Sequence, residues 1–339
     1  MQGKGKSIKT GVRMKEVATR AGVSVMTVSR ALSDPDKVSE ETLKRVRAAV
    51  DDIRYVPNEV AGNLSSRRSK AVGLIVPSIN NSLYSNTTQA ISTALRDGGF
   101  HLMIAESGLS LENEELAITG FLAQRVCGLI LHNTQHTARA RELIAQIDVP
   151  TIEIGNLTEE PLDQCVSYSN FAAAKAMTVH LGRLGYRRIG FVSLALRNND
   201  RALTRFQGYL AGIEELGLPQ HQSQAIETES GLQGGADALK RLLATHPEID
   251  AIFFAADVMA VGALLECQRR GWKVPSRVAI ASFDDVDLLR HVVPTITTVR
   301  IPREEIGRRS AEMLMARLEG RSLPKVMNLG FEIIQREST

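Results

Sequence analysis

Residues 14–31, MKEVATRAGVSVMTVSRA, decide the fold of the N-terminal part of this chain. Apolar residues at three- and four-residue spacing predict two short helices on either side of a tight turn. Gly22 can adopt the positive φ that ends the first helix, because it has no Cβ. Ser24 offers a side-chain oxygen to the free amides at the start of the second helix. The stretch therefore predicts a helix-turn-helix unit.

The second helix of this unit is expected to bury Val28 with Ala31 or Leu32 and to expose its other face. A helix held at a fixed angle by another, with small or polar residues outward, has the geometry that enters a DNA major groove. The candidate DNA-contacting residues of this unit are Ser24, Val25, Met26, Thr27, Ser29 and Arg30. For the two apolar residues of this set, Val25 and Met26, packing against another helix is the alternative role.

The charges divide unevenly along the chain. Residues 1–70 hold 15 Lys and Arg against 8 Asp and Glu, whereas residues 71–339 hold 26 against 30. A basic head of about +7 ahead of a body of about −4 suggests a polyanionic partner for the head alone. A solubilising tail built on the lysines at positions 4, 6 and 9 is the alternative. The helical pattern that follows argues against it.

A chain of 339 residues is long for one domain. A third helix, capped by Ser39, completes a small helical core, and Val56-Pro57-Asn58 ends it. A helix as short as residues 59–66 is marginal in water, which makes that segment a candidate switch. The expected organisation is a disordered basic tail, an all-α helix-turn-helix domain, a hinge helix with linker, and a larger core, at residues 1–13, 14–57, 58–70 and 71–339.

From residue 71 the pattern alternates between apolar strands and amphipathic helices, which predicts parallel sheets covered by helices on both faces. The expected strands cover residues 71–77, 100–105, 128–132, 151–154, 188–193, 224–228, 251–255 and 278–283, with a strand-like run at 325–335. Two doubly wound subdomains fit the length, the first at about 71–168 and 301–328, the second at about 169–300 and 329–339. Two such halves would enclose a cleft at the carboxyl ends of their strands.

Several classes of protein lack support in the sequence. No N-terminal apolar region or membrane-length apolar run occurs, so we expect a cytoplasmic protein with no membrane partner. No dinucleotide fingerprint, P-loop or nucleophile elbow is present, so we expect neither catalytic residues nor a cofactor. His132 and His136 are four residues apart but span a predicted strand end, so no metal site is expected. The three cysteines have no metal-ligand spacing and are typical of reduced, buried thiols.

Four motifs make the chain similar to the LacI/GalR family of transcription regulators over nearly its whole length. They are VSVMTVSRAL at 23–32, YVPNEVAGNL at 55–64, LGYRRIGFV at 184–192 and VAIASFDDVD at 278–287. Within that family the chain most resembles gluconate-type repressors, through ALLECQRRGWKVP at 263–275 and LPKVMNLGF at 323–331. The resemblance implies a DNA-binding head, a hinge helix and a core like that of periplasmic sugar-binding proteins.

The resemblance also implies a homodimer that reads a pseudopalindromic operator, because a two-fold protein needs two related half-sites. Val25 and Met26 match the positions that vary most with operator sequence, and apolar side chains there would read thymine methyls or groove shape. The neighbouring polar residues would mostly contact the DNA backbone. Leu64 matches the leucine that wedges between base pairs in the minor groove, with Asn58 and Ala61 beside it.

In the core, Arg205 and Asp284 match the pocket arginine and aspartate of the family. Tyr84 follows the first strand and could cap a ligand, and Glu153 falls near the cleft edge of its strand. Asp257 opens a helix, but Ala256 stands where many family members have an asparagine. Four of these residues also have a structural alternative: Arg205 as a surface arginine, Asp284 or Asp285 as a helix cap, Tyr84 as a core residue, and Glu153 as a second-layer or solvent-facing residue.

The expected effector is a sugar acid such as gluconate or 2-ketogluconate, with Arg205 and Arg201 available to pair its carboxylate. Such a ligand would release a repressor from its operator, while corepression remains the opposite possibility. A neutral sugar or a purine-like corepressor is the alternative ligand class. A periplasmic-type solute-binding protein would share the core but would need a signal peptide and no basic head.

Overall fold

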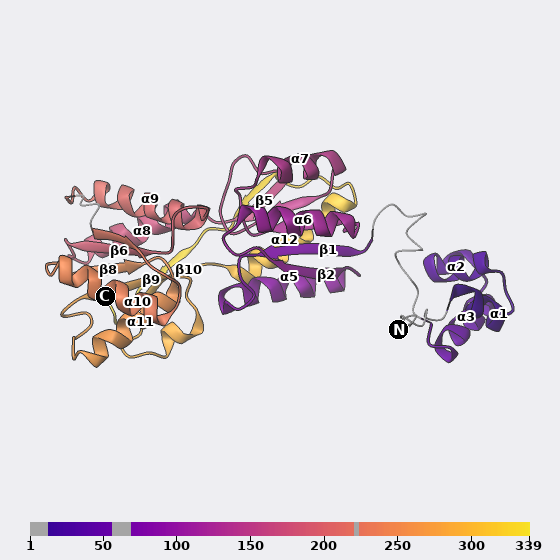
Figure 1. Ribbon diagram of the computed structural model, residues 1–339, viewed down its shortest axis with the longest axis horizontal. Coiled ribbons are helices and arrows are strands. Elements are labelled where there is room, and N and C mark those ends of the chain that lie inside the picture. The colour runs from indigo at the N-terminus through magenta and orange to yellow at the C-terminus, as the bar shows by residue number, and fades with distance from the viewer. Residues whose placement is uncertain (1–12, 56–68, 220–223) are drawn as a thin grey trace, which may run out of the picture. The chain divides into compact units, whose positions relative to one another are not determined.

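The computed structural model describes residues 13–55, 69–219 and 224–339, in two compact units that comprise residues 1–69 and 70–339 (Figure 1). Each unit is described by itself. The hinge residues Asn58, Ala61 and Leu64 lie outside the described residues, so their roles stay predictions.

The first unit contains the three expected helices, α1 (Met14–Ala21), α2 (Val25–Ser33) and α3 (Glu40–Asp52), with a short turn of helix at Pro35–Lys37. Gly22 ends α1 with a φ of 65°, in the left-handed region that glycine adopts without strain. Ser24 caps α2 by accepting a hydrogen bond from the Thr27 amide at 3.0 Å. The three helices enclose a small core that is centred on Val17, Val28 and Val46, each with no exposed surface.

In its described residues, the second unit contains two six-stranded sheets. The first has the order β11-β5-β4-β3-β1-β2, and its strands are β1 (Ala71–Val76), β2 (His101–Glu106), β3 (Gly128–Leu131), β4 (Thr151–Glu153), β5 (Gln164–Ser167) and β11 (Val326–Asn328). The second has the order β12-β10-β9-β8-β6-β7, and its strands are β6 (Ile189–Ser193), β7 (Ala225–Glu227), β8 (Ala251–Phe254), β9 (Ala279–Phe283), β10 (Thr297–Arg300) and β12 (Glu332–Ile334). Neighbouring strands are parallel except β10 and β12.

Helices cover both faces of each sheet, as parallel sheets require. On the first sheet, one face carries α5 (Ser85–Asp97) and α12 (Arg303–Leu318), and the other carries α6 (Leu111–Ala123) and α7 (Ala138–Ile147). On the second sheet the pairs are α8 (Asn170–Arg183) with α9 (Asp200–Glu215), and α10 (Leu232–Thr245) with α11 (Asp257–Arg269). Short helical turns lie at Ser82–Tyr84 and Asp287–Arg290.

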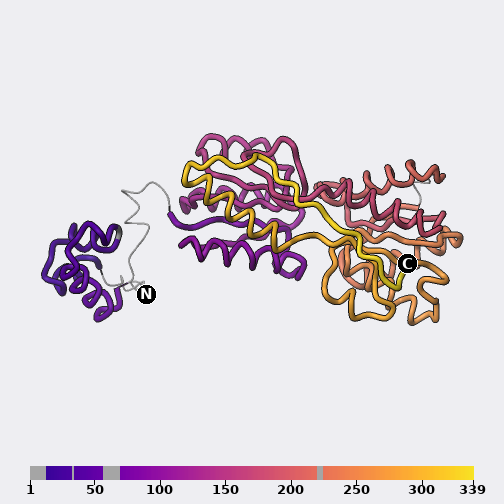
Figure 2. The backbone as a smooth tube through the Cα atoms, turned by 180° about the vertical axis from the view of Figure 1, so that it is seen from behind, coloured from indigo at the N-terminus to yellow at the C-terminus, as the bar shows by residue number. Residues whose placement is uncertain are grey.

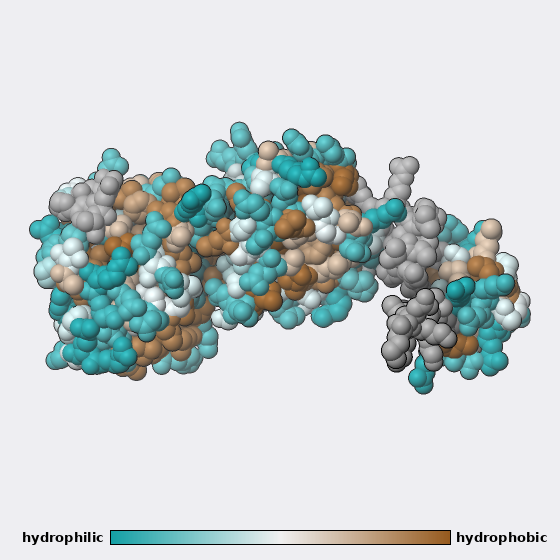
Figure 3. All heavy atoms as spheres, viewed as in Figure 1, coloured by the Kyte–Doolittle hydropathy of each residue, from teal (hydrophilic) through white to brown (hydrophobic). Residues whose placement is uncertain are grey.

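Hydrophobic side chains fill the space between helices and sheets, while the visible outer face is mostly hydrophilic with smaller hydrophobic patches (Figure 3). No helix within the described residues has the length and apolar character to cross a membrane.

The chain passes between the two sheets three times, after β5, after β10 and after β11 (Figure 2). The prediction missed β5 and β10, which have only four residues each. The predicted run at 325–335 is two strands on different sheets, because the chain turns at Gly330, with a φ of 71°, as it crosses. Helix α12 begins at Arg303, directly after the second of these crossings. These crossings bring strand ends and helix starts from distant parts of the sequence to one place.

Candidate DNA interface and effector cavity

Helix α2 presents the two apolar residues that the sequence singled out. The exposed fractions are 44% for Val25 and 72% for Met26, whereas Val28 and Ala31 are buried at 0% and 1%. The core of the first unit therefore uses the opposite face of the helix, and the exposed pair is available for contact with another molecule. Large apolar side chains that are exposed together on a short helix suit contact with a macromolecule.

The polar residues of α2 divide into two kinds. The hydroxyl of Ser24 is engaged at the helix start, where it contacts the Thr27 hydroxyl at 2.8 Å and accepts from the Thr27 amide. Ser29 is half-buried, and Arg30 is exposed in the last turn of the helix. An exposed guanidinium there suits a phosphate contact. The contacts of these residues with DNA stay predictions.

In the second unit, four of the five residues predicted for the effector line one cavity between the sheets. They are Tyr84, Arg205, Asp257 and Asp284. Each comes from a different place: a helical turn after β1, the second turn of α9, the first residue of α11, and the end of β9. This is the edge of a doubly wound sheet where ligands are expected.

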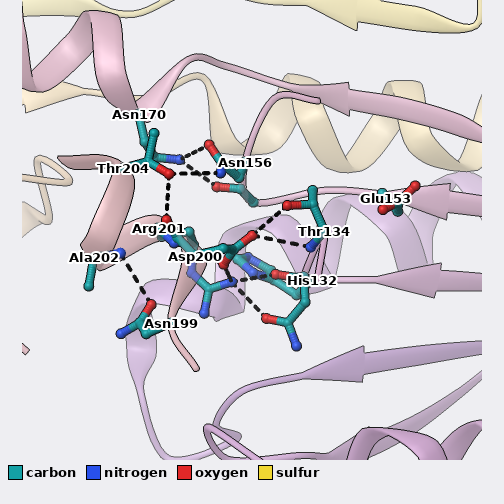
Figure 4. Close-up of polar contacts among 12 residues, drawn as sticks. His132, Thr134, Glu153, Asn156, Asn170, Asn199, Asp200, Arg201, Ala202 and Thr204 are labelled. Carbon is teal, nitrogen blue, oxygen red and sulfur yellow. Dashed lines mark hydrogen bonds and ion pairs between the residues drawn. The ribbon is translucent and has the colours of Figure 1, made fainter. Parts of the chain in front are cut away.

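Glu153 does not line this cavity, which corrects the expectation that placed it at the cleft edge. Its side chain is buried in the first subdomain, where Oε1 lies 3.2 Å from Nε2 of His136 and Oε2 accepts from the Leu162 amide. In Figure 4, no contact joins Glu153 to the other residues drawn. The carboxylate is thus used within its own subdomain. Its strand-end position alone could not reveal that.

Glu153 belongs to a buried ionic cluster with Glu114 and His136. Nδ1 of His136 lies 2.7 Å from Oε2 of Glu114, and both glutamate side chains are essentially inaccessible to solvent. Burial by itself lowers the pKa of His136, but the hydrogen bonds and charges of the two carboxylates outweigh it and raise this pKa to about 9. The imidazole is therefore charged at neutral pH and balances one of the two carboxylates.

Each side-chain nitrogen of Arg205 donates a hydrogen bond within the protein. Its Nε donates to Asn170 Oδ1 at 2.7 Å, Nη1 to the Ala255 carbonyl at 2.6 Å, and Nη2 to the Tyr168 hydroxyl at 3.0 Å. The guanidinium also stacks 3.7 Å from the centroid of the Phe283 ring. The residue is 7% exposed, which excludes the surface role considered from the sequence. Arg205 therefore joins α8, α9 and the ends of two strands into one wall.

Asp284 and Asp257 supply the negative charge of the cavity. Asp284 has a φ of 97°, in the left-handed region where a non-glycine residue is strained, and such strain is common at functional sites. Its carboxylate lies 3.5 Å from Nη1 of Arg205 and accepts a short hydrogen bond from Arg303. Burial, and next the charge of Asp284, raise the pKa of Asp257 to about 6. The site thus combines tightly placed charges of both signs.

Among the residues that line the cavity but were not assigned to it from the sequence are His132, Tyr168 and Arg303. His132 meets the Tyr84 ring edge-on, with centroids 4.7 Å apart. Burial, followed by the charge of Arg201, holds the pKa of His132 well below its usual value, so the ring is neutral. His132 directly follows β3, so the strand-end rule could have found it. Arg303 gave no such signal, because it follows a crossing between sheets.

Comparison with known proteins agrees with both parts of this geometry. Residues 13–58 match the model of bacterial regulatory proteins of the lacI family, and residues 178–339 match a periplasmic binding protein-like domain. The regulator GntR of Pseudomonas aeruginosa is 36% identical over 328 residues, which covers 96% of this chain and 95% of that protein. This chain belongs to the LacI family.

Solved structures extend the likeness of this LacI-family regulator to three dimensions. A LacI-family transcriptional regulator from Silicibacter pomeroyi has a TM-score of 0.89 and 30% identity, covering 96% of this chain and 99% of that one. The lac repressor dimer bound to operator and an anti-inducer has a TM-score of 0.85 at 24% identity, covering 97% and 99%, and shares the fold. Regulators of this family bind operator DNA and small-molecule effectors and act as dimers, which confirms the predicted fold and the general function.

The two subdomains of this LacI-family regulator contact each other beside the cavity. Thr134 donates to Asp200 from its hydroxyl at 2.6 Å and from its amide at 3.2 Å, so the loop after β3 meets the start of α9 (Figure 4). Nη1 of Arg201 donates to the His132 carbonyl at 2.6 Å and to Asn133 Oδ1 at 2.9 Å. These contacts form a latch across the cleft.

Proposed function

We propose that this regulator represses genes of sugar-acid utilisation, and that a sugar acid such as gluconate or 2-ketogluconate releases it from its operator. The observation that carries the proposal is the charge of the cavity, where Arg201, Arg205 and Arg303 line the same space as Asp257 and Asp284. Guanidinium groups pair with carboxylates through charge-assisted hydrogen bonds, and aspartates accept hydrogen bonds from hydroxyls. A ligand that carries both groups uses both kinds of side chain.

The relatives support the same ligand class. The Pseudomonas aeruginosa relative carries the name GntR, and the motifs at 263–275 and 323–331 are those that make this chain resemble gluconate-type repressors. Alanine at position 256, as N-cap of α11, makes no side-chain cap and offers no amide to a ligand. The side chains of Asn81 and Asn199, which line the same cavity, provide amides from other elements.

On the DNA side, we propose that two copies of the first unit bind the two halves of a pseudopalindromic operator. Met26 and Val25 would contact thymine methyls or sense groove shape, and Arg30 would contact phosphate. Leu64, with Asn58 and Ala61, would act in the minor groove. As a DNA-bound regulator, the protein would work in the cytoplasm and would carry no catalytic activity of its own.

The mechanism is a coupling between two sites. Effector binding favours one relation of the two sheets, which the latch at Thr134 and Asp200 stabilises, and residues 58–70 connect that change to the DNA-binding unit. Linkage requires that operator DNA and effector weaken each other by the same factor. An effector that instead strengthened operator binding would make the protein a corepressed regulator.

The decisive experiment is titration calorimetry of the full chain with a panel of aldonic and keto-aldonic acids, neutral sugars and purines. Binding by at least one sugar acid, with neutral sugars and purines weaker, is the expected result. Repeating the titration in the presence of saturating operator DNA should reduce the affinity for the acid. If a neutral sugar or a purine binds and every sugar acid fails, the sugar-acid proposal is wrong. Equal effector affinity with and without operator would reject the induction mechanism.

A further inference from the structure

Arg303 is the cavity arginine whose guanidinium is least committed to the protein itself. It is the first residue of α12, directly after the chain has crossed from β10. Within residues 13–55, 69–219 and 224–339, its side-chain hydrogen bonds all leave from Nη2 and end on Asp284. A guanidinium carries five N–H donors in a planar fork, so a further partner can be held through two of them.

The other two cavity arginines, Arg205 and Arg201, use more of their donors in contacts within the protein. Arg205 uses all three of its nitrogens on Asn170, Ala255, Tyr168 and Asp284. Arg201 uses Nη1 in the latch across the cleft and lies 3.2 Å from Asp200. A ligand carboxylate would have to displace existing partners of Arg205, at the cost of leaving buried acceptors unpaired.

In the cavity that Arg303 lines, three arginines face two aspartates, which favours an anion. The carboxylate of Asp284 is shared between two guanidiniums, those of Arg205 and Arg303. Asp257 is the other acidic residue of the cavity, and its Oδ1 accepts from the Val258 amide rather than from an arginine. Within the described residues, Arg303 hydrogen-bonds to one carboxylate, that of Asp284, which Arg205 also uses, while Asp257 interacts with Arg303 through its charge alone. A second carboxylate beside Arg303 would complete the pairing.

The position of Arg303 suits one end of an elongated ligand. Arg303 and Asp284 line the cavity and also an adjoining open depression, whose other charged residues are Asp285, Asp287, Arg290, Arg300, Glu304 and Glu305. Side chains that can form hydrogen bonds with ligand hydroxyls line other parts of the cavity. One of them is Ser193, whose Oγ is buried and has no hydrogen-bond partner within the described residues. An acid group at one end and hydroxyls along the chain would match this arrangement.

We infer that Arg303 holds the carboxylate of the effector through two hydrogen bonds, and that this residue makes the cavity selective for an acid over the matching neutral compound. The inference rests on the proposed function and replaces Arg205 and Arg201 as the expected carboxylate partners. Arg205 instead fixes the cavity wall and Asp284, which can accept from ligand hydroxyls.

The test compares an aldonic acid with its uncharged amide, because the two differ mainly at the carboxylate. The probes are D-gluconate and D-gluconamide, or the tightest acid of the panel and its amide, titrated into the full chain at pH 7.5. The wild type should prefer the acid by about 10- to 100-fold, the range expected for charge-assisted hydrogen bonds. Arg303→Met should reduce this preference to within about threefold while the affinity for the amide changes little.

Two more variants make the result specific. Arg303→Lys keeps the charge without the planar fork, so it should retain part of the preference for the acid. Arg201→Met should weaken both probes together and leave their ratio unchanged, because it acts on the latch. Thermal unfolding of each variant reports its folding, and Asp284 keeps Arg205 as a partner when Arg303 is replaced.

The outcomes separate the two proposals. If the wild type binds a sugar acid but Arg303→Met retains its preference over the amide, the role of Arg303 is wrong and the proposed function stands. If Arg303→Met does not fold, Arg303→Lys decides the question. Should Arg303→Lys prefer the acid over the amide as strongly as the wild type does, Arg303 does not hold the carboxylate through two hydrogen bonds. If the wild type binds no sugar acid at all, the proposed function fails.

Discussion

The DNA-binding helix and the effector cavity use opposite strategies to present functional side chains. Helix α2 is nine residues long and exposes three of its candidate contacts, Val25, Met26 and Arg30. The cavity gathers charged residues from distant segments and buries them, with Arg205 and Asp284 at 7% and 3% exposure. An exposed residue can change at little cost in folding stability, whereas a buried ion pair cannot. Operator choice and effector choice therefore face different constraints in this protein.

Replacing Arg205 should expose that difference most strongly. Arg205→Ala leaves the Ala255 carbonyl, Asn170 and one side of Asp284 without their donor in a buried site. Breaking such a pair typically destabilises a protein by about 3–5 kcal/mol. Urea unfolding of the full chain measures the loss, and effector binding should vanish with it.

The matched control for that loss is Arg241→Ala, which replaces an exposed arginine of α10 and should change stability by less than about 0.5 kcal/mol. Equal losses for the two variants would mean that the Arg205 contacts do not stabilise the fold.

The buried cluster of Glu114, His136 and Glu153 should make stability depend on pH. The pKa of His136 is raised to about 9, so its stabilising contribution is complete below about 6.5 and is lost as the pH rises through 9. His136→Gln leaves two buried carboxylates facing a neutral amide, and breaking a buried pair in this way costs about 3–5 kcal/mol at neutral pH.

Urea unfolding at pH 6.5, 8 and 9.5 checks this point. The wild type should lose stability over this range by more than His136→Gln does, because only the wild type has the histidine to deprotonate. Parallel curves for the two proteins would contradict a charged His136.

On the exposed side of the comparison, Met26→Ala should alter operator preference without altering the core. Losing one base contact typically costs about 1–3 kcal/mol at the affected position, so operators that differ there should change rank. Fluorescence anisotropy against a set of operator variants measures the ranking, with urea unfolding as the check on the core.

Arg30→Ala is the counterpart within the same helix. A phosphate contact carries little sequence information, so this variant should weaken binding to all operators alike. The slope of log K against log salt concentration should become shallower by about one. If Arg30→Ala changed the order of affinity among the operators, the phosphate contact assigned to Arg30 would be wrong. If Met26→Ala left that order unchanged, the base contact assigned to Met26 would be wrong.

The smallest expected effect concerns the latch. Thr134→Val removes the hydroxyl bond to Asp200 but keeps the amide bond, so the contact between subdomains should weaken by about 1 kcal/mol. Effector affinity should fall by about fivefold in calorimetry. Thr245→Val is the control, since its hydroxyl donates to the Arg241 carbonyl within α10, away from the contact between the subdomains. Unchanged affinity in Thr134→Val would show that the latch does not take part in ligand binding.

The sequence predicted the local features better than those that depend on distant parts of the chain. Gly22 and Ser24 act within one turn of their own helix, so their roles were readable from residue type and position. The strand-end rule and the resemblance to the family assigned four residues to one effector site, and all four line the cavity: Tyr84, Arg205, Asp257 and Asp284. Glu153 obeys the same rule but is drawn into its own subdomain by His136, a pairing that spacing along the chain does not encode.

Arg303 shows the limit most clearly. Its place in the cavity depends on β10, a four-residue strand that the apolar pattern did not reveal, and on the crossing that follows it. Likewise, the run at 325–335 looked continuous because both of its halves are apolar, although they belong to different sheets. Short strands carry too little periodicity to be placed from sequence alone.

The triple crossing between the sheets also determines how this protein can be recombined with its relatives. Each sheet is completed by a strand from the last 14 residues of the chain, β11 for one and β12 for the other. A single joint at any point between β1 and β12 would therefore mix strands of two parents in at least one sheet. A joint near residue 69, where the two compact units meet in sequence, separates whole units instead. Exchange of the DNA-reading head is thus the simple route to a new gene target, whereas a new effector has to arise by point substitution within the cavity.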